Sequence, residues 1–362
     1  MRLPALRRVI FRSSLLFALV ALLTPLPAPA AGGHANAFIY HRFGDDRYPS
    51  TDISAEAFAA QLAWLKKEGR PVLPLGKVVR RLRAGEALPG GCVVLTVDDA
   101  FRSFLETGMP LLRRYGFPVT LFVNTAAVGR PGYLDWAELK RLAGEGVEIG
   151  NHSRTHDYLL NRRKGESAED WRGRVSGDIA AAQQELTREL GKAPTLFAYP
   201  YGEFSPALQK IVAGLGFSAA VAQQSGVISP ASDLFALPRF PMGGPYATLE
   251  GFRTKVAMKP LPVRVLAPDT PVLADPGAPP VLRFAIDMQV IRTDELNCFV
   301  QGQNACRVVA EPGRAGEFTA VADHALAGRR NKYTLTAPGR RGGWYWFSQP
   351  WFLPDSSAGG DY

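Results

Sequence analysis

Short apolar runs alternate with helix-like segments from residue 36 to about residue 242, and this alternation restricts the possible folds more than any other feature. Strand-like runs occupy residues 37–40, 93–97, 119–123, 147–149, 196–199 and 219–221. Between them, apolar residues recur at helical spacing near residues 58–65, 107–115, 136–143, 175–190 and 206–215, with Ser54 a candidate N-cap of the first. This order predicts an α/β fold with a parallel sheet closed, or nearly closed, into a barrel.

The pattern changes beyond residue 255. Seven prolines fall within residues 260–280, and apolar side chains then alternate with other residues over residues 282–290, which is typical of a β-strand. We therefore predict a barrel domain over residues 31–254 and a Pro-rich linker with a small β-sandwich-like module over residues 255–362. Trp344, Trp346 and Trp351 near the end are predicted core residues of this module, with a sugar-stacking platform as the alternative.

Residues 1–30 have the form of a secretory signal peptide. Four arginines precede an apolar run at residues 15–23, and Ala28-Pro29-Ala30 supplies a small-residue cleavage pattern. The run is short for a membrane span, although an uncleaved N-terminal anchor is the alternative. The sequence thus predicts an exported protein that is periplasmic, on the cell surface or secreted.

Charge and cysteine content narrow the possible partners. Cleavage after Ala30 would lower the formal net charge from +9 to +5, and no Lys/Arg block with interleaved aromatic residues marks a nucleic-acid surface. The remaining excess of positive charge favours at most peripheral association with an anionic cell envelope. The sequence indicates no protein partner. An exported protein can oxidise Cys298 and Cys306 to a disulfide across a hairpin, with two buried thiols as the alternative, and Cys92 is a predicted core residue.

The stretch VVLTVDDAFRSF (residues 93–104) places Asp98 and Asp99 at the end of an apolar strand. Consecutive side chains of a strand point to opposite faces, so both can serve one site only if the strand ends there. In α/β barrels the carboxyl ends of the strands form the active site. Capping of the next helix is one explanation for the pair, and a bound cation, which would relieve the repulsion between the two carboxylates, is another.

Histidines follow other predicted strands. VEIGNHSRTHDYL (residues 147–159) holds His152 and His156 at i, i+4 spacing, which places both on one face if the segment coils. One Asp and two His form a three-ligand metal site with open positions, as catalytic metals have. His41 ends the first strand, and Pro200-Tyr201-Gly202 forms a turn after another, where the Tyr201 N–H can point into the same mouth. The alternatives are surface or capping roles for His152 and His156, and a core or loop role for His41. For residues 200–202 the alternative is a simple strand-to-helix turn.

These segments together resemble the polysaccharide deacetylases with the NodB-homology domain (carbohydrate esterase family 4). TVDDA is similar to their T-F-D-D-G motif, HSRTH to their histidine motif, and YPYG to their third motif. The resemblance covers residues 36 to about 242 and implies a distorted (β/α) barrel that removes N-acetyl groups from an N-acetylglucosamine-containing polysaccharide. It also implies that Asp98 is the general base and that Asp99, His152 and His156 bind one divalent metal ion, with zinc the best fit and nickel, cobalt or iron compatible.

The chain departs from the family pattern at three places. Ala198 replaces the usual arginine of the third motif, Ala100 replaces the glycine after the two aspartates, and no L-x-L-H histidine follows His156. IYHRFGDDRYPST resembles instead the circularly permuted branch that includes poly-β-1,6-N-acetylglucosamine deacetylases, which implies that His41 is the general acid. Tyr201, Pro200 and Arg239 are the candidates for binding the oxyanion and the substrate.

Arg239, in the segment LPRFP, is also a candidate replacement for the missing arginine as the partner of Asp98, although a structural salt bridge fits equally well.

Three other functions remain open. A non-catalytic, glycan-binding relative is one, because Ala198 breaks a family motif. The same hydrolysis on another acylated polymer, such as peptidoglycan, is the second. Non-haem iron oxygenases also use two histidines and one carboxylate, but Asp99 and His152 lie 53 positions apart within an α/β pattern, which disfavours them.

Overall fold

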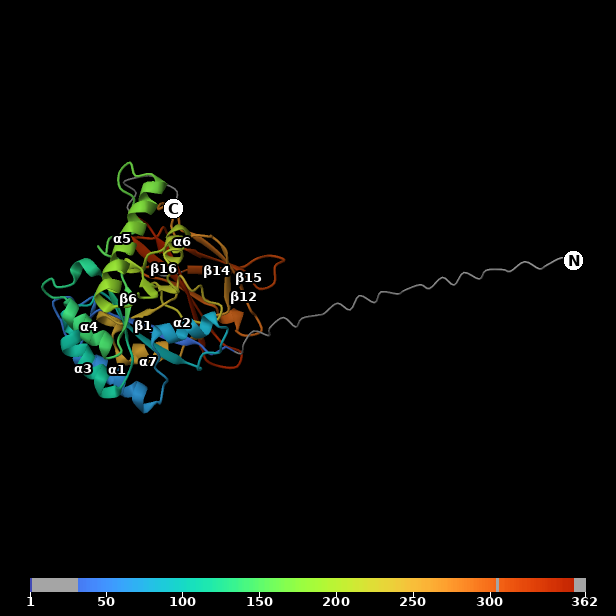
Figure 1. The fold of residues 1–362 in the computed structure, drawn as a ribbon. Coiled ribbons are helices and arrows are strands. Elements are labelled where there is room, and N and C mark those ends of the chain that lie inside the picture. The colour runs from blue at the N-terminus through green and yellow to red at the C-terminus, as the bar shows by residue number, and fades with distance from the viewer. Residues whose placement is uncertain (2–31, 304–305, 355–362) are drawn as a thin grey trace. The chain divides into compact units, whose positions relative to one another are not determined.

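The computed structural model describes residue 1, residues 32–303 and residues 306–354 (Figure 1). The predicted signal peptide therefore lies, apart from Met1, outside the described residues. Within these ranges, no helix is both long enough and apolar enough to cross a membrane. The described residues from 32 onward form one compact unit.

A seven-stranded sheet forms the centre of the larger part of the structure. Its strands lie in the order β8-β7-β6-β5-β4-β1-β9 and all pair in parallel. Their bounds are β1 (Ala35–Tyr40), β4 (Cys92–Val97), β5 (Thr120–Val123), β6 (Glu148–Asn151), β7 (Leu196–Ala198), β8 (Ala219–Val221) and β9 (Phe240–Pro241). Leu237 bridges to Val221 of β8, and Phe240 pairs with Phe38 of β1, so one segment connects the two edges of the curled sheet. The predicted distorted (β/α) barrel is confirmed.

Helices join the strands and cover the sheet, and α1, α3 and α4 lie beside one another in Figure 1. Their bounds are α1 (Ala55–Lys67), α2 (Leu75–Arg83), α3 (Met109–Tyr115), α4 (Trp136–Gly144), α5 (Ala168–Leu190), α6 (Pro206–Gly214) and α7 (Leu249–Val256). Ser54 caps α1 as predicted, because its side chain accepts from the Ala57 N–H. Helix α5 begins earlier than the apolar spacing predicts, since Ser167 caps it and acidic residues occupy its first turn.

The sequence pattern does not predict α2, which lies at the amino ends of the strands. The Leu75 N–H donates to Thr120 Oγ1 at 3.3 Å, and the Gly76 N–H donates to Glu148 Oε2 at 2.9 Å. Thr120 and Glu148 are the first residues of β5 and β6, and the apolar side chains of α2 pack with Phe122 and Ala198 inside the barrel. Helix α2 therefore covers the end of the barrel opposite the carboxyl ends of the strands.

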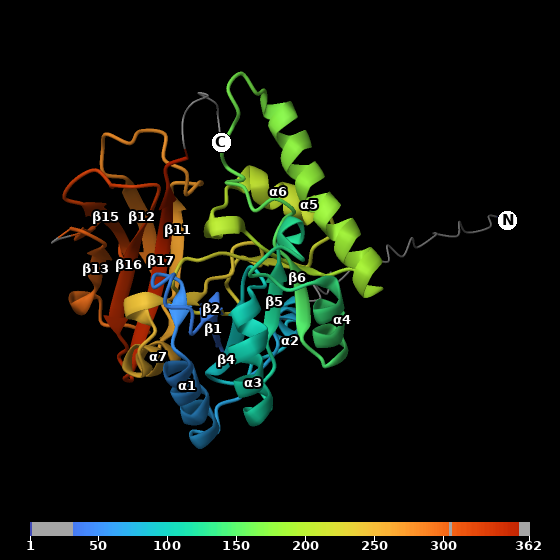
Figure 2. The same cartoon turned by 90° about the vertical axis from the view of Figure 1, so that its left-hand side faces the viewer.

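A small all-β module follows α7, as predicted, and Figure 2 shows its strands β11, β12, β13, β15, β16 and β17 grouped together. One sheet has the order β10-β17-β16-β13 and the other the order β11-β12-β15-β14. The bounds are β10 (Lys259–Pro260), β11 (Val263–Ala267), β12 (Val281–Ile286), β13 (Asn297–Val300), β14 (Cys306–Ala310), β15 (Glu317–Ala322), β16 (Arg330–Pro338) and β17 (Trp344–Phe352). Side chains of both sheets, including Phe284, Leu335 and Trp351, share one apolar core, as in a sandwich.

Two expectations about this module need correction. Cys298 and Cys306 form the predicted disulfide, but the predicted hairpin is wrong. Strand β13 pairs with β16 and β14 pairs with β15, so the bond joins the two sheets. Trp351 is 1% exposed and belongs to the core, whereas Trp344 is 47% exposed and does not.

Candidate active site

The carboxyl ends of β1, β4, β5 and β6 meet at one edge of the barrel and bring the predicted residues together. The Asp98 N–H donates to the Tyr40 carbonyl at 2.9 Å, which places His41 beside Asp98. The His152 N–H donates to the Val123 carbonyl at 3.0 Å, which places His152 beside the residue that follows β5. The register of the parallel sheet thus assembles this site from segments far apart in the chain.

The backbone at this edge adopts a conformation that side chains normally disfavour. Among the described residues, the non-glycine positions with left-handed φ are Asp99 (74°), Ala100 (56°), Ser153 (63°), His156 (58°) and Tyr201 (57°). All of them lie in the loops at the carboxyl ends of β4, β6 and β7. Such strain concentrates at functional sites. It also explains how two adjacent aspartates serve one site, since the chain turns at Asp99 directly after the strand ends.

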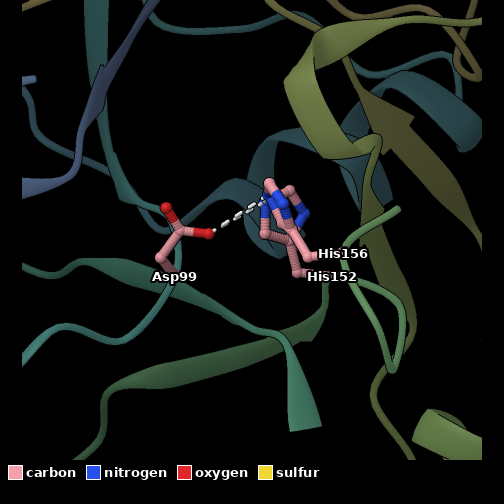
Figure 3. A group of neighbouring side chains, drawn as sticks. All are labelled: Asp99, His152 and His156. Carbon is pink, nitrogen blue, oxygen red and sulfur yellow. Dashed lines mark hydrogen bonds and ion pairs between the residues drawn. The ribbon is translucent and has the colours of Figure 1, made fainter. Parts of the chain in front are cut away.

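Asp99, His152 and His156 converge on one point (Figure 3). Asp99 Oδ1 lies 3.6 Å from His152 Nε2 and 3.3 Å from His156 Nε2, and the two Nε2 atoms are 3.2 Å apart. His152 is 1% exposed, whereas the side chains of Asp99 and His156 keep 13% and 19% exposure. The group is therefore largely buried but partly exposed to solvent at Asp99 and His156.

The chemistry of these three atoms fits a cation. His152 Nδ1 donates to the Ala198 carbonyl at 2.8 Å, so the neutral ring presents a lone pair at Nε2. Burial lowers the pKa of His152 to about 3, which keeps the ring neutral. Asp99 Oδ1 is buried without a hydrogen-bond partner, and burial raises the pKa of Asp99 to about 6. A single proton cannot satisfy three converging acceptors, whereas one divalent ion can.

Asp98 lies beside this group but has a different partner. Arg239 Nη1 donates to Asp98 Oδ1 at 2.7 Å and Nη2 donates to Oδ2 at 2.9 Å, and both side chains are 0% exposed. Burial alone would raise the pKa of Asp98, but the Arg239 guanidinium, together with His152 and His41, outweighs it and lowers the pKa to about 2. Asp98 Oδ2 remains 3.8 Å from His152 Nε2. Asp98 is therefore an ionised carboxylate next to the candidate metal ligands.

Arg239 is the partner of Asp98, as both alternatives that the sequence leaves open require. It also donates from Nε to the Ala222 carbonyl at 2.9 Å and from Nη1 to Thr96 Oγ1 at 3.0 Å, so the guanidinium is fixed in place. Ala198 occupies the position of the usual family arginine, and its carbonyl orients His152 instead. The guanidinium that faces Asp98 thus comes from the residue directly before β9.

His41 and Tyr201 both lie near the group. His41 is partly buried at the end of β1, close enough that its charge lowers the pKa values of Asp98 and Asp99. The Tyr201 ring lies 4.6 Å from the His156 ring. The backbone bonds of the turn run from Gly202 N to the Tyr199 carbonyl and from Glu203 N to the Pro200 carbonyl, so they leave the Tyr201 N–H unused.

Asn124 is a residue of this edge that sequence reasoning missed. It follows β5 in an extended conformation, so its side chain points to the same side of the sheet as that of Phe122. Arg239 also lies on this side, because its guanidinium carbon is 5.5 Å from the Phe122 ring. Asn124 is 7% exposed, and its Oδ1 is buried without a hydrogen-bond partner. Its only sequence signal is a polar residue directly after an apolar strand, which many loop residues share.

Comparison with known proteins shows that part of the chain is similar to deacetylases. Residues 85–220 match the family Polysaccharide deacetylase. The chain is 23% identical over 210 residues to the poly-β-1,6-N-acetyl-D-glucosamine N-deacetylase of Staphylococcus aureus strain MRSA252, which covers 56% of this chain and 72% of that protein. It is 25% identical over 230 residues to the Escherichia coli K12 enzyme of the same name, covering 54% of this chain and 34% of that protein.

The fold agrees with that of a solved relative. The structure of IcaB from Ammonifex degensii superposes with a TM-score of 0.55 at 25% identity, covering 62% of this chain and 97% of that one. The family match contains Asp98, Asp99, His152, His156 and the turn at Tyr201, whereas His41 and Arg239 lie outside it.

Proposed function

Because the chain carries a polysaccharide deacetylase domain of the NodB type, homologous to the poly-β-1,6-N-acetylglucosamine deacetylases, we propose that it hydrolyses N-acetyl groups of an N-acetylglucosamine-containing polysaccharide. The observation that carries this proposal is the convergence of Asp99, His152 and His156 beside the ionised, buried Asp98. A glycan-binding relative without activity would have no need for a carboxylate held ionised next to three metal-ligating atoms.

The three converging side chains would hold one divalent cation. Zinc suits two imidazoles and a carboxylate, and nickel, cobalt and iron suit them as well. Bound there, such an ion lowers the pKa of water from about 16 to about 7 and polarises a carbonyl oxygen. Partial exposure of Asp99 and His156 leaves the open side on which substrate and water can approach.

Asp98 and His41 carry the protons of the proposed reaction. Asp98 accepts a proton from the water whose oxygen adds to the acetyl carbon, and the Tyr201 N–H donates to the oxyanion that forms. The C–N bond then breaks, and His41 gives a proton to the departing amine. Acetate and a glucosamine residue are the products. Arg239 keeps Asp98 ionised, and Pro200 shapes the turn that presents Tyr201.

Metal dependence is the first test of this proposal. Acetate release from β-1,6-linked N-acetylglucosamine oligomers is expected to stop after chelation and to return with added Zn²⁺, Ni²⁺ or Co²⁺. His156→Ala is expected to lower the metal content and to reduce acetate release by more than about 100-fold, because even the outer partners of metal ligands contribute 10–100-fold. His324→Ala, an exposed histidine of the β module, is the matched control. Undiminished activity of the metal-free protein would exclude the mechanism.

The polymer is a separate part of the proposal. The relatives named for poly-β-1,6-N-acetyl-D-glucosamine support that substrate class. Parallel assays with peptidoglycan and with O-acetylated polymer measure the alternatives directly. Acetate release from peptidoglycan that exceeds release from the β-1,6-linked oligomers would replace the proposed substrate.

We also propose export through residues 1–30, as their sequence predicts. A mature protein that begins after Ala30 in N-terminal sequencing supports this, and a retained N-terminus contradicts it.

Asn124 is proposed to bind the sugar that carries the acetamido group. A buried carbonyl oxygen without a donor accepts a hydrogen bond readily, and an O–H or N–H of the sugar supplies one. Asn124→Leu is expected to lower kcat/KM for the oligomer by about 5–150-fold, the cost of a lost buried hydrogen bond. Hydrolysis of 4-nitrophenyl acetate, which has no sugar, is expected to stay within about twofold.

Gln224→Leu is the matched control for Asn124. Gln224 Oε1 is also buried without a partner, but its amide group donates to the Ala236 carbonyl and the residue lines a cavity of about 750 Å³ next to the β module. An equal loss of oligomer activity in both variants, or an unchanged kcat/KM in Asn124→Leu, would contradict a role of Asn124 in substrate binding.

A further inference from the structure

The β module contacts the turn of the candidate active site through two consecutive arginines. Arg330, the first residue of β16, donates from Nη1 to the Tyr201 carbonyl at 3.0 Å. Arg329 donates from Nε and Nη2 to the carboxylate of Glu203, at 2.7 and 2.6 Å. Glu203 directly follows the Pro200–Gly202 turn and is 2% exposed. One end of the module therefore contacts the turn at the Tyr201 carbonyl and, directly after the turn, at the Glu203 side chain.

We propose that the β module is part of the catalytic apparatus, with Arg329 and Arg330 as positioning residues for the oxyanion-binding turn. This inference rests on the proposed hydrolytic function. The two arginines lie outside residues 85–220, where the family match ends. The deacetylase fold alone would thus lack the contacts that hold its own oxyanion donor.

The turn needs support from outside because its local conformation is unfavourable. Tyr201 has a φ of 57°, a left-handed conformation that is unfavourable for a non-glycine residue. A Cβ added to Gly202 would lie 2.4 Å from Gln223 Cβ, so the chain is also closely packed there. The turn contains only two backbone hydrogen bonds of its own. Contacts that fix the Tyr201 carbonyl therefore fix the plane and direction of the adjoining peptide groups.

Aromatic stacking supplies the second constraint on Tyr201. Its ring stacks on that of Tyr158 at 3.9 Å, with an interplanar angle of 16°. The Arg329 guanidinium lies 4.0 Å above the Tyr158 ring, and that of Arg330 lies 5.5 Å from the Tyr201 ring. Arg330 thus contacts both the carbonyl and the ring of Tyr201, whereas Arg329 contacts the Glu203 carboxylate and the Tyr158 ring that stacks on Tyr201. A cation over an aromatic ring is attracted by its quadrupole, which favours this layered arrangement.

The arginines are themselves held by the module. The Leu353 N–H donates to the Arg329 carbonyl at 2.8 Å, and β16 pairs with β17 along its whole length. Lys332 donates to Ser225 Oγ at 2.9 Å, and the rings of Phe352 and Phe204 lie 5.6 Å apart. The module therefore contacts the barrel at several points beside the turn. These contacts hold in place the backbone that carries Arg329 and Arg330.

Arg330→Met is the variant that tests this inference, since the Arg330 side chain is 44% exposed and its loss leaves the fold intact. Loss of an oxyanion donor lowers kcat by about 10²–10³-fold, so misplacement of that donor is expected to lower kcat by about tenfold or more. KM and metal content are expected to stay within about twofold, because a positioned N–H acts mainly in the transition state. Arg330→Lys is expected to recover part of the rate.

Assays with two substrates distinguish a failure of this inference from a failure of the proposed function. An oxyanion turn serves every acyl substrate, so Arg330→Met is expected to slow 4-nitrophenyl acetate and the β-1,6-linked oligomer to the same extent. Glu203→Gln, which weakens the Arg329 pair without removing the buried side chain, is expected to act in the same direction. Arg292→Met, which breaks the exposed Arg292–Glu295 pair of the module, is the control.

Two results would overturn the inference. One is a kcat of Arg330→Met within twofold of the wild type on both substrates, and the other is a fall that Arg292→Met shares. Failure of the wild-type protein to release acetate from N-acetylglucosamine oligomers would reject the proposed function, while the ester assay would still report on the turn.

Discussion

Replacement of Asp98 with asparagine is expected to lower kcat by about 10²–10⁴-fold, the usual contribution of a general base, while the metal stays bound. Asp98 is not one of the three converging atoms, so it can be neutralised without loss of a ligand. Asp99→Asn provides the contrast, because it is expected to release the metal. Activity and elemental analysis of both variants therefore assign different roles to two adjacent carboxylates.

His41→Ala separates the proposed base from the proposed acid. An amine must be protonated as it leaves, whereas 4-nitrophenolate leaves without a proton. Asp98→Asn is therefore expected to slow both the oligomer and 4-nitrophenyl acetate, and His41→Ala only the oligomer. An Asp98→Asn enzyme with its metal bound and kcat within tenfold of the wild type would assign the base to another residue.

The local sequence predicts which residues form the candidate metal site, Asp99, His152 and His156, but not their geometry. Apolar runs locate β4 and β6, and the polar residues directly after them are Asp98, Asp99 and His152. A parallel sheet brings the carboxyl ends of its strands to one edge, so proximity follows from the fold class. The i, i+4 spacing of His152 and His156 only partly explains their convergence, because the segment is a loop with a left-handed residue at His156 rather than a helix.

Contacts between distant segments are harder to predict. Arg239 meets Asp98 across 141 positions, and it is a candidate only because the usual family arginine is missing. Arg329 meets Glu203 across 126 positions, and no periodicity or motif indicates that pair, because it depends on how the module packs against the barrel. The same limit explains the disulfide, where the spacing of Cys298 and Cys306 indicates a bond but not that their strands belong to different sheets.

Arg239→Met is expected to destabilise the fold and to move the pH dependence of the reaction. Removal of one partner from a buried ion pair costs about 3–5 kcal/mol of unfolding free energy, because the other charge stays buried without compensation. The pKa of Asp98 is lowered from 3.8 to about 2 in the folded protein, so the pair stabilises the fold above about pH 4. This contribution disappears as the pH falls towards 2, and the difference between variant and wild type should shrink over the same range.

The expected loss of activity in Arg239→Met is largest at low pH, whereas the expected loss of stability is smallest there. Burial raises the pKa of Asp98 when the guanidinium no longer opposes it, so the carboxyl group binds a proton at pH values where the wild type is ionised. A protonated Asp98 cannot accept a proton from water. The acid limb of the kcat/KM profile is therefore expected to move to higher pH, with activity partly recovered on the alkaline side, where the carboxylate is again ionised and is a stronger base than in the wild type.

Arg239→Lys keeps the positive charge but cannot form two parallel bonds to the carboxylate, so its acid limb is expected between those of the wild type and Arg239→Met. An acid limb that stays in place in both variants, with reduced thermal stability, would show that Arg239 only stabilises the fold. A graded shift would show that the arginine sets the protonation state of Asp98. The guanidinium would then weaken the base so that it remains ionised within the barrel.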